Sequence, residues 1–204
     1  MTEEATLTIT TLGNQGDGLA PFESGLISVP FALPGETIRV ACTREKEHVY
    51  GHILEILKPS PARITPPCPV FGACGGCRLQ HMDDASYRAW KIGAVNHLLE
   101  KNGFAIRAAE MFVTPPASRR RASFAIKKEN NNVELGFHGR ESHSIIPITA
   151  CNVLKPQLTA LIEPLRKILN DVLENNQTLT LHTTIVNEAI ELVFSEVILN
   201  TKQQ

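Results

Sequence analysis

The chain has 204 residues, of which 43% are hydrophobic and 20% are charged, a balance typical of a globular protein with a core of its own. The longest uncharged apolar stretch, residues 25–35, contains two prolines and is shorter than the roughly 20 residues that span a bilayer. The N-terminus has no signal-peptide pattern. We therefore expect a cytoplasmic monomer without a membrane partner.

The net charge of −1 conceals an uneven distribution. Residues 1–60 carry eight acidic and four basic side chains, whereas the remainder carries 13 acidic and 16 basic ones. Five basic residues and no acidic residue lie between Pro115 and Lys128. Contact with a nucleic acid would therefore come from a local basic patch and not from a strongly basic surface.

The first sixty residues read as short strands separated by glycine and proline turns. The β-prone segments are 6–12, 26–31, 37–42 and 49–57. Ile38, Val40 and Cys42 share one face of the third segment, so Cys42 is expected to be a core thiol. Four or five short strands in this length predict an OB-like β-barrel.

Two helices are expected in the remainder. Five prolines in residues 59–69 exclude regular structure there and predict a linker. Asp83 and Asp84 can cap a helix that ends before Gly103, with an apolar stripe that includes Tyr87 and Trp90. Pro156 can begin a second helix, whose apolar residues recur at helical spacing up to residue 172.

Further strands are predicted around these helices, in residues 119–126 and, with an interrupting turn, in 134–148. Residues 178–186 and 189–199 form a hairpin across Asn187 and Glu188. The sequence thus predicts an α+β protein in three parts: a barrel (1–60), a linker with a cysteine loop (61–82) and a central domain (83–204), which we expect to be incomplete.

Three of the five cysteines lie within ten residues, in the pattern C-x5-C-x2-C formed by Cys68, Cys74 and Cys77. Such a group in a cytosolic chain indicates metal binding and not disulfides. Thiolates suit iron–sulfur clusters and zinc alike, and Cys151 is the only other cysteine downstream. Zinc stays open, because His81 could complete a Cys3His site.

The segment CPVFGACGGCRLQH resembles the iron–sulfur motif of the S-adenosylmethionine-dependent RNA uracil-5-methyltransferases. The first sixty residues, with GDGLA, VPFALPGE and the closing KPSPAR, look like the family's RNA-binding TRAM domain, an OB-type barrel. SRRRASFAI looks like the arginine-rich strand of its central domain, which is a mixed α/β domain. ELGFHGRESHSIIPITACNVLKPQL matches the stretch that brings in the fourth cluster cysteine. The resemblance implies a 4Fe–4S cluster held by Cys68, Cys74, Cys77 and Cys151.

The arginine-rich segment is a candidate RNA contact. In a strand, Arg119, Arg121 and Ser123 lie on one face, where guanidinium groups can grip phosphate oxygens. The pattern alone fits a solvated strand equally well, but the resemblance favours RNA. Lys127 and Lys128 could extend the patch.

The family's chemistry needs an S-adenosylmethionine-binding domain, a nucleophilic cysteine and an acidic base. The residues after Cys151 contain no cysteine and no glycine-rich loop after a strand. We therefore expect an inactive N-terminal part of a methyltransferase that acts on ribosomal or transfer RNA, with S-adenosylmethionine bound by a domain beyond residue 204. A free-standing RNA-binding module and a zinc-binding interaction module are the alternatives. The cluster is expected to be structural, since it closes a loop of more than seventy residues.

Overall fold

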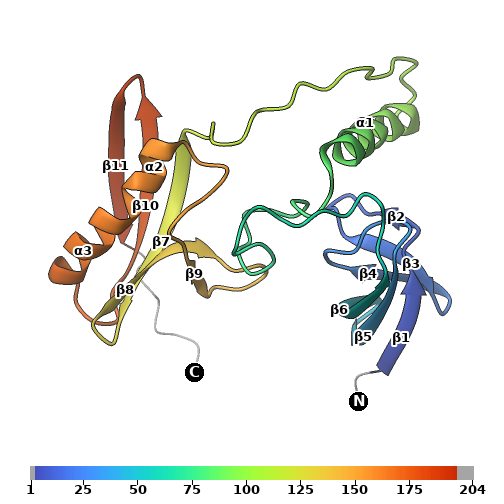
Figure 1. Ribbon diagram of the computed structural model, residues 1–204, viewed down its shortest axis with the longest axis horizontal. Coiled ribbons are helices and arrows are strands. Elements are labelled where there is room, and N and C mark those ends of the chain that lie inside the picture. The colour runs from blue at the N-terminus through green and yellow to red at the C-terminus, as the bar shows by residue number, and fades with distance from the viewer. Residues whose placement is uncertain (1–2, 197–204) are drawn as a thin grey trace. The chain divides into compact units, whose positions relative to one another are not determined.

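The computed structural model describes residues 3–196, which form two compact units (Figure 1). The first unit contains the chain up to Pro67 together with residues 78–112, and the second contains residues 68–77 and the chain from Val113 onward. This division differs from the sequence-based boundaries at residues 60 and 82. The helix after Asp83 belongs to the first unit, and the cysteine loop belongs to the second.

The first unit is built on one curled six-stranded sheet, with the strand order β1-β5-β6-β4-β3-β2. Its strands are β1 (Glu3–Thr8), β2 (Thr11–Leu12), β3 (Gly18–Phe22), β4 (Gly25–Val29), β5 (Thr37–Glu45) and β6 (His48–Lys58). The register between β5 and β6 shifts twice, and such irregularities bend and twist a sheet. The predicted strands and a barrel-like N-terminal region are confirmed.

Side-chain alternation along β5 decides which face is the core. Ile38, Val40 and Cys42 are buried among the apolar residues of the curled sheet, so Cys42 is a core thiol, as predicted. Burial raises the pKa of the Cys42 thiol, which keeps it protonated and unreactive.

Helix α1 (Asp84–Lys101) begins where the sequence predicts. The Asp83 carboxylate accepts a hydrogen bond from the Ser86 N–H at 2.9 Å, which satisfies one of the unpaired donors of the first turn. The predicted apolar stripe is wrong for the later turns, because α1 has no fully buried residue and Leu98 is 61% exposed. Its first turns pack against a small core through Tyr87 and Trp90.

The second unit contains an antiparallel five-stranded sheet in the order β11-β10-β7-β8-β9. The strands are β7 (Arg121–Glu129), β8 (Asn132–His138), β9 (Ile145–Pro147), β10 (Thr178–Val186) and β11 (Ala189–Glu196). The hairpin between β10 and β11 turns at Asn187 and Glu188, as predicted. Residues 197–199, which the prediction assigned to its second strand, lie outside the described residues.

Helices α2 (Pro156–Ala160) and α3 (Ile162–Val172) lie against one face of this sheet (Figure 1). The sequence predicted one continuous helix, but a turn at Leu161 divides it. The helices bury their apolar residues against the inward face of β7, where Phe124 and Ile126 are fully buried. Within residues 3–196, no helix has the length and apolar character needed to cross a membrane.

Candidate metal centre and RNA-contact face

The cysteine loop, residues 68–77, is folded by its own backbone. The Phe71 N–H donates to the Cys68 carbonyl at 3.1 Å, and the Cys74 N–H donates to the Val70 carbonyl at 2.9 Å. Gly72 has a φ of +91°, which a residue with a Cβ adopts only with strain. The turn at Gly72 thus reverses the chain between the first two cysteines of the motif.

The loop is held against the turn that follows β8. The Gly75 N–H donates to the His138 carbonyl at 3.0 Å, and the Arg140 N–H donates to the Ala73 carbonyl at 3.2 Å. A Cβ on Gly75 would lie 3.0 Å from the His138 oxygen and 3.2 Å from the Gly139 oxygen. Close approach of the two backbones therefore favours a glycine at position 75.

The segment that carries Cys151 is fixed in the same unit. The Ala117 N–H donates to the Asn152 carbonyl at 2.9 Å, and the Arg119 N–H donates to the Val153 carbonyl at 3.0 Å. Cys151 packs against the same apolar core as Val70 of the cysteine loop. Two segments far apart in sequence therefore bring all four predicted ligands, including Cys68, Cys74 and Cys77, into one unit.

All four of these cysteines are half-buried, which leaves their sulfur atoms able to bind a metal. The Gly76 N–H lies 3.5 Å from the Cys74 sulfur as a donor, the kind of amide contact that stabilises a metal-bound thiolate. The donor chemistry fits a 4Fe–4S cluster. Within the described residues, however, no three His, Cys, Asp or Glu side chains are gathered closely enough to hold a metal ion.

His81, the predicted zinc alternative, is a buried residue of the first unit. Its ring packs edge-on against Phe31, with the ring centroids 6.1 Å apart. Burial and the nearby positive charge of Arg63 lower the pKa of His81 to about 4. The imidazole is therefore neutral at physiological pH and belongs to the packing of the first unit.

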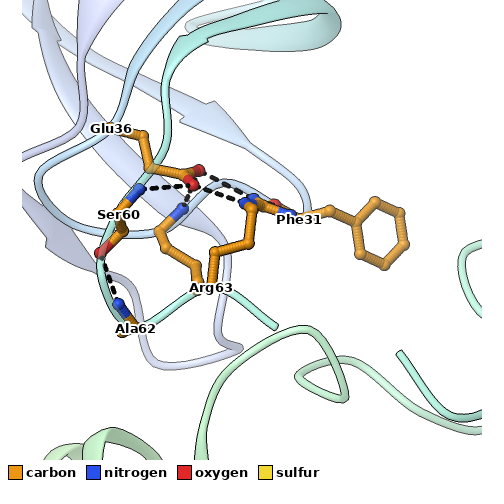
Figure 2. A network of polar contacts seen from close by, with 6 residues as sticks. Phe31, Glu36, Ser60, Ala62 and Arg63 are labelled. Atoms are coloured by element: carbon orange, nitrogen blue, oxygen red, sulfur yellow. Dashed lines mark hydrogen bonds and ion pairs between the residues drawn. The ribbon is translucent and has the colours of Figure 1, made fainter. Parts of the chain in front are cut away.

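Glu36 forms the most densely bonded polar site of the first unit. Its fully buried carboxylate accepts hydrogen bonds from the Leu33 N–H at 2.8 Å and from both Arg63 Nε and Nη2, at 2.5 and 2.8 Å. Figure 2 shows Arg63 reaching the carboxylate beside Ser60, whose N–H donates at 3.2 Å. Arg63 Nη2 also donates to the Phe31 carbonyl at 2.7 Å.

Burial alone would raise the pKa of Glu36, but the hydrogen bonds from Arg63, Leu33 and Ser60 outweigh it and lower the pKa. The carboxylate is ionised and tied to the chain that leads out of β6. Sequence reasoning did not single out Glu36 or Arg63, although they end the segments VPFALPGE and KPSPAR. An acidic residue after a long apolar stretch was the available signal.

The arginine-rich segment leads into β7: Arg121 is the first residue of the strand, whereas Arg119 precedes it and forms an isolated bridge with Leu154. Arg119 and Arg121 are exposed, and they border a groove of about 330 Å³ together with Ser123 and His182. The Ser123 hydroxyl and His182 Nδ1 lie 2.9 Å apart. Phe124 and Ile126 are fully buried, but Ala125 between them is also buried, so the predicted alternation does not hold over these residues.

The two predicted lysines have intramolecular partners. Lys127 forms an ion pair with Glu129 at 2.8 Å, which raises the pKa of Lys127. The Lys128 ammonium donates to the carbonyls of Asn170 and Leu173, at 2.6 and 2.9 Å, and so caps the C-terminal end of α3. Arg119 and Arg121 are thus better disposed than the lysines for contact with a phosphate.

Several known proteins have sequences similar to this chain. No family model matches the chain. An uncharacterized RNA methyltransferase of Caulobacter vibrioides is 37% identical over 190 residues, which are 91% of this chain and 45% of the relative. A 23S rRNA (uracil(1939)-C(5))-methyltransferase of Pectobacterium atrosepticum is 36% identical over 172 residues, 82% of this chain and 38% of the relative.

The chain is a relative of bacterial RNA methyltransferases. A second 23S rRNA (uracil(1939)-C(5))-methyltransferase, from Chromohalobacter salexigens, is 39% identical over 167 residues, 80% of this chain and 35% of the relative. The resemblance drawn from the cysteine motif is confirmed by these relatives. The chain spans less than half the length of the curated methyltransferases that it matches.

Proposed function

We propose that these 204 residues are the RNA-binding, cluster-bearing part of an RNA uracil-5-methyltransferase that acts on ribosomal or transfer RNA. We assign methyl transfer to the part of these relatives that the chain does not match, which is more than half of their length. The observation that carries the proposal is the folding of the cysteine loop and the Cys151 segment onto one core, in a homologue of RNA methyltransferases.

Cys68, Cys74, Cys77 and Cys151 would hold the 4Fe–4S cluster. When bound, the cluster supplies a covalent link between the loop and the segment that precedes α2. Such a link restricts the unfolded chain, because it closes a long loop. We assign the cluster a structural role.

The RNA contact in the second unit rests on Arg119 and Arg121. Both side chains are exposed, and a planar guanidinium can donate two parallel hydrogen bonds to a phosphate. Lys127 and Lys128 contribute less, because Glu129 and the end of α3 already hold their ammonium groups. We assign the curled sheet of the first unit to the OB-type TRAM class, whose faces bind single-stranded nucleic acid.

Metal analysis of the anaerobically purified chain tests the proposal. We expect iron and acid-labile sulfide in equal amounts, about four of each per chain. Cys151→Ser should lose most of the iron, because one of four ligands is missing. Cys42→Ser is the matched control, since Cys42 lies in the core of the other unit, and it should keep the iron.

Two results would contradict this assignment. If the purified chain contained zinc and no iron, it would be the zinc-binding interaction module and would carry no iron–sulfur cluster. Full iron retention by Cys151→Ser would show that the fourth ligand is another residue. In a parallel filter-binding assay the wild-type chain should bind single-stranded RNA without methylating it.

A further inference from the structure

The first unit contains a groove that none of the predicted site residues lines. Its volume is about 540 Å³, and it runs between the turn after β2 and the first turns of α1. The polar and aromatic side chains that line it are Asn14, Gln15, Arg78, Tyr87, Trp90 and Lys91. The sequence assigned its two aromatic residues only to the apolar stripe of a helix.

The aromatic wall of the groove is anchored and still accessible. The rings of Tyr87 and Trp90 have centroids 6.3 Å apart and are inclined at 47°. Both side chains pack against the small core around Leu33 and Met82, yet both stay half-exposed. A ring held from one side and partly open to solvent is suited to stacking against another flat group.

The charges of the groove are all positive. The Lys91 ammonium lies 4.7 Å from the Trp90 ring centroid and 5.7 Å from that of Tyr87. Arg78 Nη1 donates to Gln15 Oε1 at 2.7 Å, which orients the guanidinium along the groove. None of the described residues that line the groove is acidic. Its ligand should therefore combine a flat aromatic group with negative charge.

We propose that this groove binds one nucleobase of single-stranded RNA, stacked on Trp90 with its edge against the Tyr87 ring, and that Lys91 and Arg78 hold the adjacent phosphate. The inference rests on the proposed RNA-binding function and adds a base-contact site in the first unit. An acidic peptide would satisfy the charges but not the aromatic wall. The site is sequence-tolerant, because every base presents a stacking face.

Trp90 is the only tryptophan of the chain, so its fluorescence reports on the groove directly. Titration of the full chain with a short oligouridylate should quench this fluorescence saturably. An abasic oligonucleotide of the same length should not quench it, since it offers phosphates without bases. Tyr87→Ala and Lys91→Ala should each weaken RNA binding about tenfold.

Arg88→Ala is the matched control, because Arg88 lies on the same helix, pairs with Asp84 and does not line the groove. It should bind RNA with unchanged affinity. Lys91→Ala leaves both aromatic rings in place, so the test still stands on this variant if Tyr87→Ala has a folding defect, seen as a lowered melting temperature.

Three other outcomes would contradict the proposed base site. If both groove variants bind RNA normally and Trp90 is not quenched, while Arg121→Ala weakens binding, the groove is not a base site and the proposed function stands. If abasic and uridine oligonucleotides quench equally, the groove binds phosphate alone. If the wild-type chain binds no RNA, both the groove and the proposed RNA-binding function are wrong.

Discussion

The Glu36 site and the cysteine loop are both built from motif residues, but they differ in what completes them. The Glu36 carboxylate is fully buried and accepts four hydrogen bonds from its own chain. The thiols of Cys68, Cys74 and Cys77 are half-buried, and backbone hydrogen bonds hold their loop in place. The first site is complete as folded, whereas the second presents donor atoms that a metal would complete.

The difference shows that some motif residues of this chain stabilise the fold, whereas others are available to bind a ligand. An ionised carboxylate without water must find its partners inside the protein, since burial of an unpaired charge is very costly. Glu36 finds them in Arg63 and two backbone N–H groups. Thiols tolerate partial exposure, and the thiols of the cysteine loop are the ones that we propose bind the cluster. Full burial and hydrogen-bond partners within the chain therefore distinguish motif residues that stabilise the fold from motif residues that are available to a ligand.

The largest effect should follow the loss of the Glu36 carboxylate. Glu36→Ala leaves the Arg63 guanidinium half-buried without its partner and two backbone donors unsatisfied, which should lower the free energy of unfolding by about 3–5 kcal/mol. Urea denaturation of the chain, followed by circular dichroism, measures the loss. The comparison between the two sites predicts that iron content per folded chain stays unchanged.

The control for Glu36→Ala is Glu55→Ala, which removes an exposed carboxylate paired with Arg39. Exposed ion pairs contribute little, so this variant should unfold close to the wild-type midpoint. Equal destabilisation by the two substitutions would show that the buried network does not hold the first unit together.

The elements themselves were largely predictable, and the sites were predictable in part. The alternation of Ile38, Val40 and Cys42 and the capping by Asp83 are local properties, so the sequence displays them. The partners of Glu36 lie at positions 33, 60 and 63, and pairing over such a distance in sequence leaves no periodic signal. The cysteine spacing indicated a metal, but the docking of Gly75 on His138 depends on a strand from another part of the chain.

Helix α1 shows a second limit of sequence reasoning. Its apolar residues recur at helical spacing, yet only Tyr87 and Trp90 find a core to pack against. Periodicity indicates which residues share a face but does not show what covers that face. For this reason the aromatic groove was invisible in the sequence.

The next largest effect is a loss of stability of the first unit at acidic pH. His81 titrates near 6.5 in the unfolded chain, but burial and Arg63 lower its pKa to about 4 in the folded protein. Between these values the unfolded state binds more protons, so stability is full above about pH 6.5 and falls as the pH drops toward 4. The expected loss is about 3 kcal/mol.

Urea midpoints between pH 7 and pH 4 measure this loss, and NMR titration of the His81 ring protons gives the pKa directly. The pKa of Glu36 is lowered, so its contribution is lost only at lower pH, as the pH falls below about 4.5 and through its folded pKa. An NMR pKa of His81 near 6.5 would contradict the buried, neutral imidazole.

The smallest effect tests the backbone docking of the cysteine loop. A Cβ on Gly75 would lie 3.0 Å from the His138 oxygen, and relief of that contact requires the loop to shift from the turn after β8. Gly75→Ala should therefore cost about 1–3 kcal/mol and lower the iron retained after gel filtration. In Gly76→Ala the nearest atom, the Cys74 sulfur, lies at an ordinary 3.5 Å, so this neighbouring variant should stay close to wild type. If both variants retain iron and unfold alike, the docking of Gly75 on His138 does not position the cysteines. The cysteine loop would then not depend on its backbone contacts in the way that the Glu36 site depends on its buried ion pair.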